Sequence, residues 1–144
     1  MLLAEFPIAV LMERRRAQHP WDTGRWSAVA VLPPGLSASA LPEAGQDAQA
    51  RYVVDGLRLE LHRDEMAGYF ENWVAPQPKV FVAWRVRDGR AVPVAVSVSY
   101  AEGTRMLDSG DGADGVPMPR AVHQWLGACL RAHHRPQPRG RVHE

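Results

Sequence analysis

The chain has 144 residues, of which 46% are hydrophobic and 23% charged, and its formal net charge at pH 7 is +1. This length suits one domain around one core, and the hydrophobic content excludes a disordered chain. The near-zero charge argues against a dedicated nucleic-acid binder, which would carry a basic excess. The single cysteine, Cys129, excludes an internal disulfide and a multi-cysteine metal centre.

The N-terminus does not have the pattern of a secretory signal. Glu5 precedes a short apolar run over residues 6–12, and three arginines follow it at positions 14–16, whereas a signal peptide carries its positive charge first. No stretch approaches the roughly 20 apolar residues of a transmembrane helix. We therefore expect a cytoplasmic protein without a membrane span.

Apolar residues in alternation predict strands in the first part of the chain. The first strand places one face toward the core through Phe6, Ile8, Val10 and Met12. Residues 26–32 predict a second strand, which a Pro-Pro-Gly sequence ends. Residues 35–49 are rich in Ser, Ala, Pro and Gly and predict a surface loop.

The segment from Leu57 to Trp73 changes its period from two to that of a helix. Residues 51–62 predict a third strand, bent or bulged at Asp55-Gly56. Residues 64–73 then predict a helix, because its apolar residues fall at i, i+3, i+4 and i+7: Met66, Tyr69, Phe70 and Trp73.

A hairpin follows in the middle of the chain. Residues 80–86 and 92–100 predict two strands, and Asp88-Gly89 between them matches a tight turn. In the second of these strands we expect the inward residues to be Val94, Val96, Val98 and Tyr100.

The last third predicts a short helix at residues 101–107, a Gly/Asp loop at 108–115 and a final amphipathic helix opened by Pro119. The loop contains the letters G-x-G-x-x-G at residues 110–115. The dinucleotide motif requires a strand before the glycines and a helix directly after them, and residues 116–119 intervene here. We interpret this segment as a turn.

The order of elements favours an α+β fold with a mainly antiparallel sheet, one short helix and a C-terminal amphipathic helix. The pattern leaves open whether the sheet remains open or curls into a partial barrel. Regular βαβ alternation is absent. We expect residues 1–134 to form a single globular domain with the surface loop near residues 35–49, and residues 135–144 to form a polar tail.

The charged residues at the junction of the third strand and the helix are the main candidate site. Glu60 and His62 share a strand face. A carboxylate beside an imidazole can act as an acid–base pair or supply ligands to a metal ion. A metal would need a further ligand, such as His19 or His123, and no H-x-H or H-E-x-x-H spacing supports one. The plainer interpretations are exposed ion pairs with Arg58 or a protein contact.

Other reactive or aromatic residues have ordinary structural interpretations. Ser97 and Ser99 lack a nucleophile elbow, so we expect surface or sheet hydroxyls. Cys129 falls within the apolar stripe of the final helix, which predicts a packed thiol. Trp21 and Trp26, with the arginines near them, can stack on RNA bases, but core or interface anchors are the expected role.

Several segments together resemble a domain-of-unknown-function family of small proteobacterial proteins. The resemblance rests on Pro7–Arg15 with Pro20-Trp21 and Arg25-Trp26, on Gly56–Glu65 with Gly68–Phe70, and on Phe81–Arg85 with Val116–Pro119 and Trp125. Genes of this family often lie near those for molybdenum-dependent formate dehydrogenase and its maturation factors. The resemblance implies a pathway, and it supplies no catalytic residues.

From these observations we predict a non-catalytic accessory or protein-interaction factor, which the resemblance connects with the assembly of a formate dehydrogenase-like molybdoenzyme. The partner would be a molybdoenzyme subunit or a maturation factor, and no cofactor, resident metal or catalytic set is expected. Tryptophan and arginine are the usual anchors of such contacts. The predicted contact surface consists of Trp21, Arg25, Glu60, His62, Arg63 and Glu65.

Two alternatives remain open. One is a small ligand- or metal-binding module centred on His62 at the strand–helix junction. The other is an enzyme in which Glu60 and His62 serve as acid and base.

Overall fold

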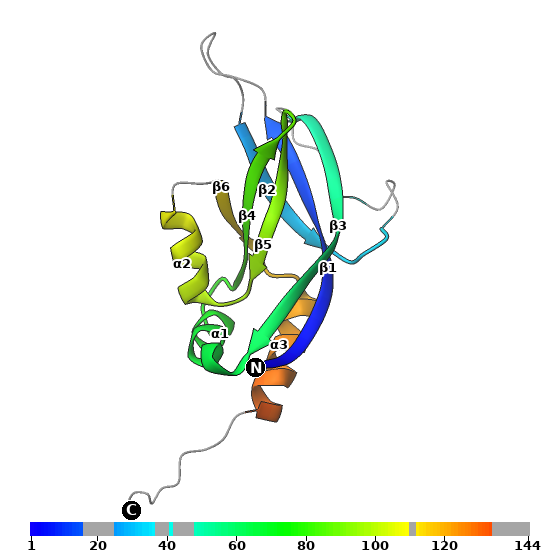
Figure 1. Cartoon of the computed structure of the whole chain (residues 1–144). Coiled ribbons are helices and arrows are strands. Elements are labelled where there is room, and N and C mark those ends of the chain that lie inside the picture. Colours follow the sequence, from blue (N-terminus) through cyan, green and yellow to red (C-terminus); the bar gives the residue numbers. More distant parts are fainter. Residues whose placement is uncertain (16–24, 37–40, 42–47, 110–111, 134–144) are drawn as a thin grey trace, which may run out of the picture.

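The computed structural model describes residues 1–15, 25–36, 41, 48–109 and 112–133. These residues form two three-stranded antiparallel sheets and three α-helices (Figure 1). The first sheet has the order β2-β1-β3, with β1 at Leu2–Arg15, β2 at Arg25–Leu32 and β3 at Ala48–His62. The second has the order β5-β4-β6, with β4 at Lys79–Arg87, β5 at Arg90–Ser97 and β6 at Gly112–Pro117.

One helical segment connects the two sheets, and the other two helices lie within or after the second sheet in the chain. A 3-10 turn, η2 (Arg63–Glu65), leads from β3 into α1 (Met66–Trp73). α2 (Tyr100–Asp108) lies between β5 and β6, and α3 (Arg120–His133) follows β6. Figure 1 shows α1 and α3 near the N-terminus, below the strands. None of these helices is long and apolar enough to cross a membrane.

The two sheets approach each other at both edges. β2 lies beside β6, and β3 lies beside β5. Strand pairing nevertheless stays within each sheet, so the described strands do not close into a barrel. The predicted α+β fold with mainly antiparallel strands is confirmed, and the structure has two sheets where the sequence suggested one.

A single cluster of apolar side chains joins both sheets to α1 and α3. β1 contributes Ile8, Val10 and Met12, as the alternation predicted. The other buried members include Leu59, Leu61, Tyr69, Val80, Val82, Val98, Val116, Val122 and Leu126. Burying one such aliphatic side chain stabilises the fold by roughly 1.5–3 kcal/mol, so this shared core holds the two sheets together.

The predicted bulge in the third strand and the predicted hairpin turn both have the expected backbone geometry. The pairing of β1 with β3 jumps from Leu57 to Val54, which places the bulge at Asp55-Gly56, and Gly56 has a φ of 84°. In the β4–β5 hairpin, Asp88 and Gly89 have φ angles of 54° and 76°. Positive φ at both central residues is the requirement of a tight hairpin turn. Both predictions are confirmed.

The predicted inward face of the strand over residues 92–100 is wrong for two of its residues. Val94 and Tyr100 are 41% and 46% exposed, respectively. The pairing shifts between Ala83 and Trp84, whose partners are Ala95 and Pro93, so Val94 is the extra residue of a bulge. A bulge changes which residues face inward. The strand also ends at Ser97, and Tyr100 opens α2.

The loop predicted at residues 108–115 is also wrong in part. Residues 112–117 form β6, which pairs with β4 from Lys79 to Trp84. Gly112 packs against the ring of Trp84, a contact that is invisible in the local sequence. Most of the predicted loop at residues 35–49 and the tail at 135–144 lie outside the described residues, and residues 48 and 49 belong to β3.

The helices predicted from apolar stripes are present. The segment at residues 64–73 forms η2 followed by α1, residues 101–107 lie within α2, and the final helix follows Pro119. On α3, Val122, Leu126 and Leu130 are buried. On α1, Tyr69 is buried, but Phe70 is 54% exposed. That exposed ring marks the feature described next.

Candidate functional site

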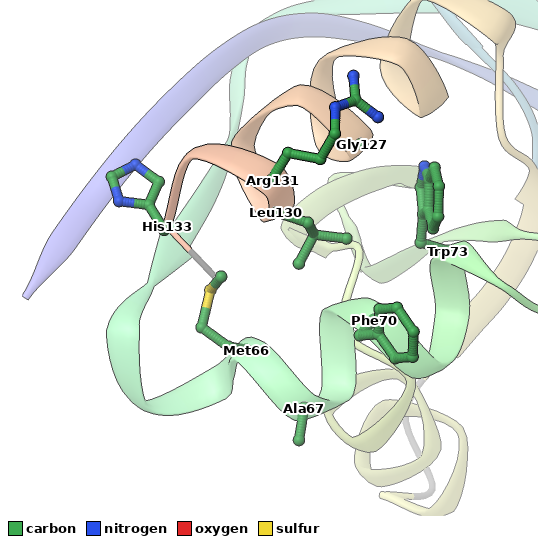
Figure 2. Close-up of a pocket in the computed structure, with 8 residues that line it drawn as sticks. All are labelled: Met66, Ala67, Phe70, Trp73, Gly127, Leu130, Arg131 and His133. Atoms are coloured by element: carbon green, nitrogen blue, oxygen red, sulfur yellow. The ribbon is translucent and has the colours of Figure 1, made fainter. Parts of the chain in front are cut away.

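An open groove lies between α1 and α3. Its volume is about 720 Å³. α1 contributes Met66, Ala67, Phe70 and Trp73 to its lining, and α3 contributes Gly127, Leu130, Arg131 and His133. Figure 2 shows Leu130 between the two helices, directed from α3 toward α1, whereas in this view Arg131 extends away from α1 and Ala67 away from α3. We call this feature the α1–α3 groove.

The spacing of the two helices depends on Trp73 and His123. The two rings stack with their centroids 5.0 Å apart and an interplanar angle of 10°. The indole Nε1–H donates to the His123 carbonyl oxygen at 3.0 Å, and His123 Nε2 lies 3.1 Å from the Trp73 carbonyl oxygen. His123 was suggested above as a metal ligand; both its ring and its backbone instead connect α3 to α1. These contacts tie the two walls of the groove together at Trp73.

Apolar side chains are exposed around α1. Phe70 and Val74, at 54% and 53% exposed, lie on α1 and just after its last residue. Met1 and Leu2 are also exposed, and the Met1 carbonyl oxygen accepts a hydrogen bond from Arg63 N–H in η2. Apolar side chains that gather at one surface, rather than scatter over it, mark interaction sites in monomeric proteins.

The charged groups that line the groove are basic. Arg131 and His133 lie in the last turn of α3, and no acidic residue is among the described residues that line the groove. Neither side chain makes an ion pair with another of the described residues. Cations at a helix C-terminus are favourable with respect to the helix dipole. They also make this surface complementary to a ligand that is both apolar and acidic.

Glu60 and His62 lie together on the exposed surface where β3 meets η2. Glu60 Oε1 is 3.1 Å from His62 Nε2, and both side chains are partly exposed. The Tyr69 hydroxyl accepts a hydrogen bond from His62 N–H at 2.8 Å and donates to the Glu60 carbonyl oxygen at 3.4 Å. These bonds attach the end of β3 to α1, so both residues lie at the start of the groove-lining helix.

Glu65 has a role in folding that the sequence did not reveal. Its Oε2 accepts a hydrogen bond of 2.5 Å from Ser99 Oγ. Ser99 also caps α2, because its Oγ accepts from Glu102 N–H at 3.2 Å. Ser97 Oγ donates to Glu102 Oε1 at 2.5 Å and accepts from Ser99 N–H at 2.9 Å.

Ser97 and Ser99 are 4% and 0% exposed, so of the expected surface or sheet hydroxyls neither is a surface hydroxyl. Ser97 is the last residue of β5 and therefore a sheet hydroxyl, whereas Ser99 lies just beyond the strand as the N-cap of α2. Glu65 and Ser99 join η2 to the start of α2, and Ser97 joins the end of β5 to α2. Folding explains this network without a catalytic role.

Arg25 lies far from the other predicted contact residues. It pairs with Arg15 at one end of β1, whereas His62 pairs with Leu2 at the other end. At about 3.3 Å per residue, the two ends of β1 are roughly 40 Å apart. The structure therefore does not bring Arg25 together with Glu60, His62, Arg63 and Glu65. Trp21 lies outside the described residues.

A family model described as a protein of unknown function, DUF3305, matches residues 7–143. The chain belongs to the DUF3305 family. This confirms the resemblance to a domain-of-unknown-function family. No curated protein and no solved structure matches the chain.

The described part of this DUF3305 chain offers few side chains that could bind a metal ion or act as a nucleophile. No group of three or more His, Cys, Asp or Glu side chains gathers among these residues in a way that could hold a metal ion. Cys129 is half-buried and packs against the core, as predicted, and burial raises the pKa of its thiol. A raised pKa keeps the thiol protonated and weakens it as a nucleophile.

The groove of this DUF3305 protein is the feature that sequence reasoning missed. Phe70 and Trp73 belong to a helical stripe, and such a stripe is usually buried in the core. Here only part of the stripe is covered, because α3 meets α1 at Gly127 and leaves Phe70 at the lip. The available signal was Gly127 in the middle of α3, which allows close contact between the helices there.

Proposed function

We propose that this DUF3305 protein is a non-catalytic interaction factor that binds a protein partner in the α1–α3 groove. The observation that carries the proposal is the groove itself, about 720 Å³ in volume, with Phe70 54% exposed at its lip. Exposed aromatic side chains beside an apolar pocket are typical anchors of protein interfaces.

The partner segment is an amphipathic helix that presents apolar side chains and at least one carboxylate. A groove between two helices accepts the apolar face of a third helix. Leu130 and Met66 offer an apolar floor, and Arg131 offers a guanidinium without an acidic partner among the described residues. A guanidinium and a carboxylate form charge-assisted, often bidentate hydrogen bonds.

Part of the predicted contact surface extends this groove. Glu60, His62 and Arg63 directly precede the α1 wall, and the first two side chains are partly exposed. Polar residues at the rim of an interface contribute mainly to specificity and to the association rate. We assign them this role around the apolar centre.

The partner acts in the assembly of a formate dehydrogenase-like molybdoenzyme. This part of the proposal rests on the sequence resemblance described above, because genes of the resembled family lie near those of formate dehydrogenase. A molybdoenzyme subunit or one of its maturation factors would carry the acidic amphipathic helix.

A complementation experiment tests both parts. The gene is deleted from its host, formate oxidation is assayed, and the strain is complemented with the wild-type gene, with Phe70→Glu or with Leu107→Glu. Leu107 is the matched control, since it is a 52% exposed apolar residue on a different helix, α2. We expect the wild type and Leu107→Glu to restore activity and Phe70→Glu to fail at equal protein level.

The outcomes separate the two claims. Normal formate oxidation in the deletion strain would refute the proposed role in formate dehydrogenase assembly. Full restoration by Phe70→Glu removes the groove as the binding surface.

The alternative of a ligand- or metal-binding module retains one supporting observation, the 3.1 Å contact of Glu60 Oε1 with His62 Nε2. A zinc titration of untagged protein, compared with His62→Ala, tests it: equal binding by the two proteins, or none, removes the alternative. The acid–base enzyme would use the same pair, and neither residue lines the groove.

A further inference from the structure

A second cleft lies between β2 and β6, far from the α1–α3 groove. Its volume is about 400 Å³. Its polar lining consists of Arg15 from the end of β1, Arg25 and Ser27 from β2, and Asp114 from β6. Residues Gly115–Pro117 complete the β6 wall.

Arg15 and Arg25 stand directly opposite each other in the β1–β2 pairing. Like charges at directly opposite positions destabilise an antiparallel pair. The nearest acidic residue along β1, Glu13, is 3.7 Å from Arg51 on β3 and is almost completely buried there. Among the described residues, neither Arg15 nor Arg25 makes an ion pair. Within the described fold, the two positive charges therefore have no ion-pair partner.

A hydrogen-bonding group in the same cleft is also unused. Ser27 Oγ has less than 1 Å² of exposed surface and no hydrogen-bond partner among the described residues. Buried hydroxyls almost always have a partner, so each exception calls for an explanation such as a ligand or an ordered water.

Asp114, on the opposite wall, is already engaged. Its Oδ2 accepts hydrogen bonds from Ala28 N–H at 2.9 Å and from Trp84 Nε1–H at 2.8 Å. These two donors partly offset its negative charge and hold it against β2 and β4. The two guanidinium groups and the hydroxyl remain as donors.

We propose that this cleft binds an oxyanion, and specifically a phosphate group, through Arg15, Arg25 and Ser27. A phosphate dianion would balance the two guanidinium charges, and rotation of the buried Ser27 side chain would let its hydroxyl donate a hydrogen bond to the ion. Arginine suits this role because its planar fork matches the geometry of phosphate and carboxylate oxygens. A carboxylate shares this chemistry, and the experiment below includes it as a separate arm.

The test compares Arg25→Gln with Arg87→Gln. Arg87 is a matched control, because it stands opposite Arg90 in the β4–β5 pairing and so has the same like-charge arrangement. It lies beside the exposed hairpin turn, and Arg90 there is placed over the Tyr52 ring at 3.6 Å. Melting temperatures are measured at low ionic strength, and then with inorganic phosphate, with succinate, or with chloride at matched ionic strength.

We expect Arg25→Gln to melt above the wild type without phosphate, because the change removes charge repulsion, and below it with phosphate. Arg87→Gln should show no such reversal. By direct titration, Arg25→Gln and Ser27→Ala should each weaken phosphate binding, the former by roughly ten- to a hundredfold. Reversal with succinate but not with phosphate would overturn phosphate as the ligand and assign the cleft to a carboxylate.

Absence of reversal with either anion, or the same effect with chloride, would overturn the proposal. Equal phosphate affinity of the wild type and Arg25→Gln would do so as well. Because Arg25 is exposed at a strand end, this substitution leaves the core intact, and a failure to bind cannot be attributed to misfolding.

Discussion

Gly127 on α3 lies directly against the indole of Trp73 on α1. A Cβ atom at position 127 would come within 2.9 Å of both Cζ2 and Nε1 of that ring. The contact brings the helices together at one end of the groove and leaves the other end open. The missing side chain therefore sets the shape of the proposed binding surface.

Gly127→Ala should destabilise the protein by about 1–2 kcal/mol. Overpacking of this kind destabilises a protein by about 1–3 kcal/mol. The higher helix propensity of alanine relative to glycine offsets up to about 1 kcal/mol of this loss. Urea denaturation provides the measurement. In a Trp73→Phe background, which removes the closest ring atoms, the same change should be neutral or stabilising. An equal cost in both backgrounds would contradict the contact as its cause.

Asn72→Ala should cost about 3 kcal/mol of unfolding free energy. Asn72 is buried, and its Nδ2 donates to the carbonyl oxygens of Lys79 and Val98, both at 2.8 Å. Its Oδ1 accepts from Lys79 N–H at 3.0 Å. Leaving such groups unpaired costs about 1–3 kcal/mol each, before relaxation. As a control, Gln124→Ala removes an exposed amide on α3 and should change stability by less than about 0.5 kcal/mol.

Ser99→Ala should destabilise the fold by about 2 kcal/mol. The change removes the cap of α2, worth about 1 kcal/mol, and also the hydrogen bond to Glu65. Ser109→Ala, at the exposed other end of α2, is the comparison and should cost clearly less. Chemical denaturation of the two variants side by side provides the measurement, and equal losses would argue against the buried network.

Tyr69 should make the protein less stable at alkaline pH. Burial raises the pKa of its hydroxyl from 10.0 to about 12, although the hydrogen bond from His62 N–H lowers it. Below pH 10 both folded and unfolded states keep the proton, and this stabilising contribution is fully present. As the pH rises to 12, the unfolded chain loses the proton first, so about 2 kcal/mol of unfolding free energy is lost.

The difference in unfolding free energy between wild type and Tyr69→Phe isolates this effect. It should be constant from pH 8 to 9.5 and then shift in favour of the variant up to pH 12. Tyr100→Phe, at an exposed tyrosine, provides the control. A difference that remains flat across the whole range would refute the assignment.

Regular periods and turn chemistry made much of the fold predictable. The alternation of Ile8, Val10 and Met12 predicted a strand, and Asp88-Gly89 predicted the hairpin. Each of these signals is local, because it depends on side-chain period or on backbone angles of adjacent residues. The bulge at Val94 was not predictable in this way, because one inserted residue reverses the inward face and depends on the partner strand.

The candidate sites depended even more on distant contacts. The charged junction at Glu60 and His62 was apparent from the sequence, and the structure confirms that the two side chains lie together. Arg25 could not be excluded from that surface until the strand register placed it at the opposite end of β1. Ser99 met Glu65 only after folding, across 34 residues of chain.

The sequence by itself determined most of the helices and strands of this protein, with β6 as the main exception, and also its α+β class and its family. These depend largely on short-range patterns. Only the tertiary structure decided which apolar residues remain uncovered and which charges meet. Phe70 and the buried Tyr69 belong to the same apolar stripe of α1, and the exposure of Phe70 follows from where α3 packs. Arg15 and Arg25 likewise become neighbours through strand pairing, so both proposed surfaces arise from packing between segments.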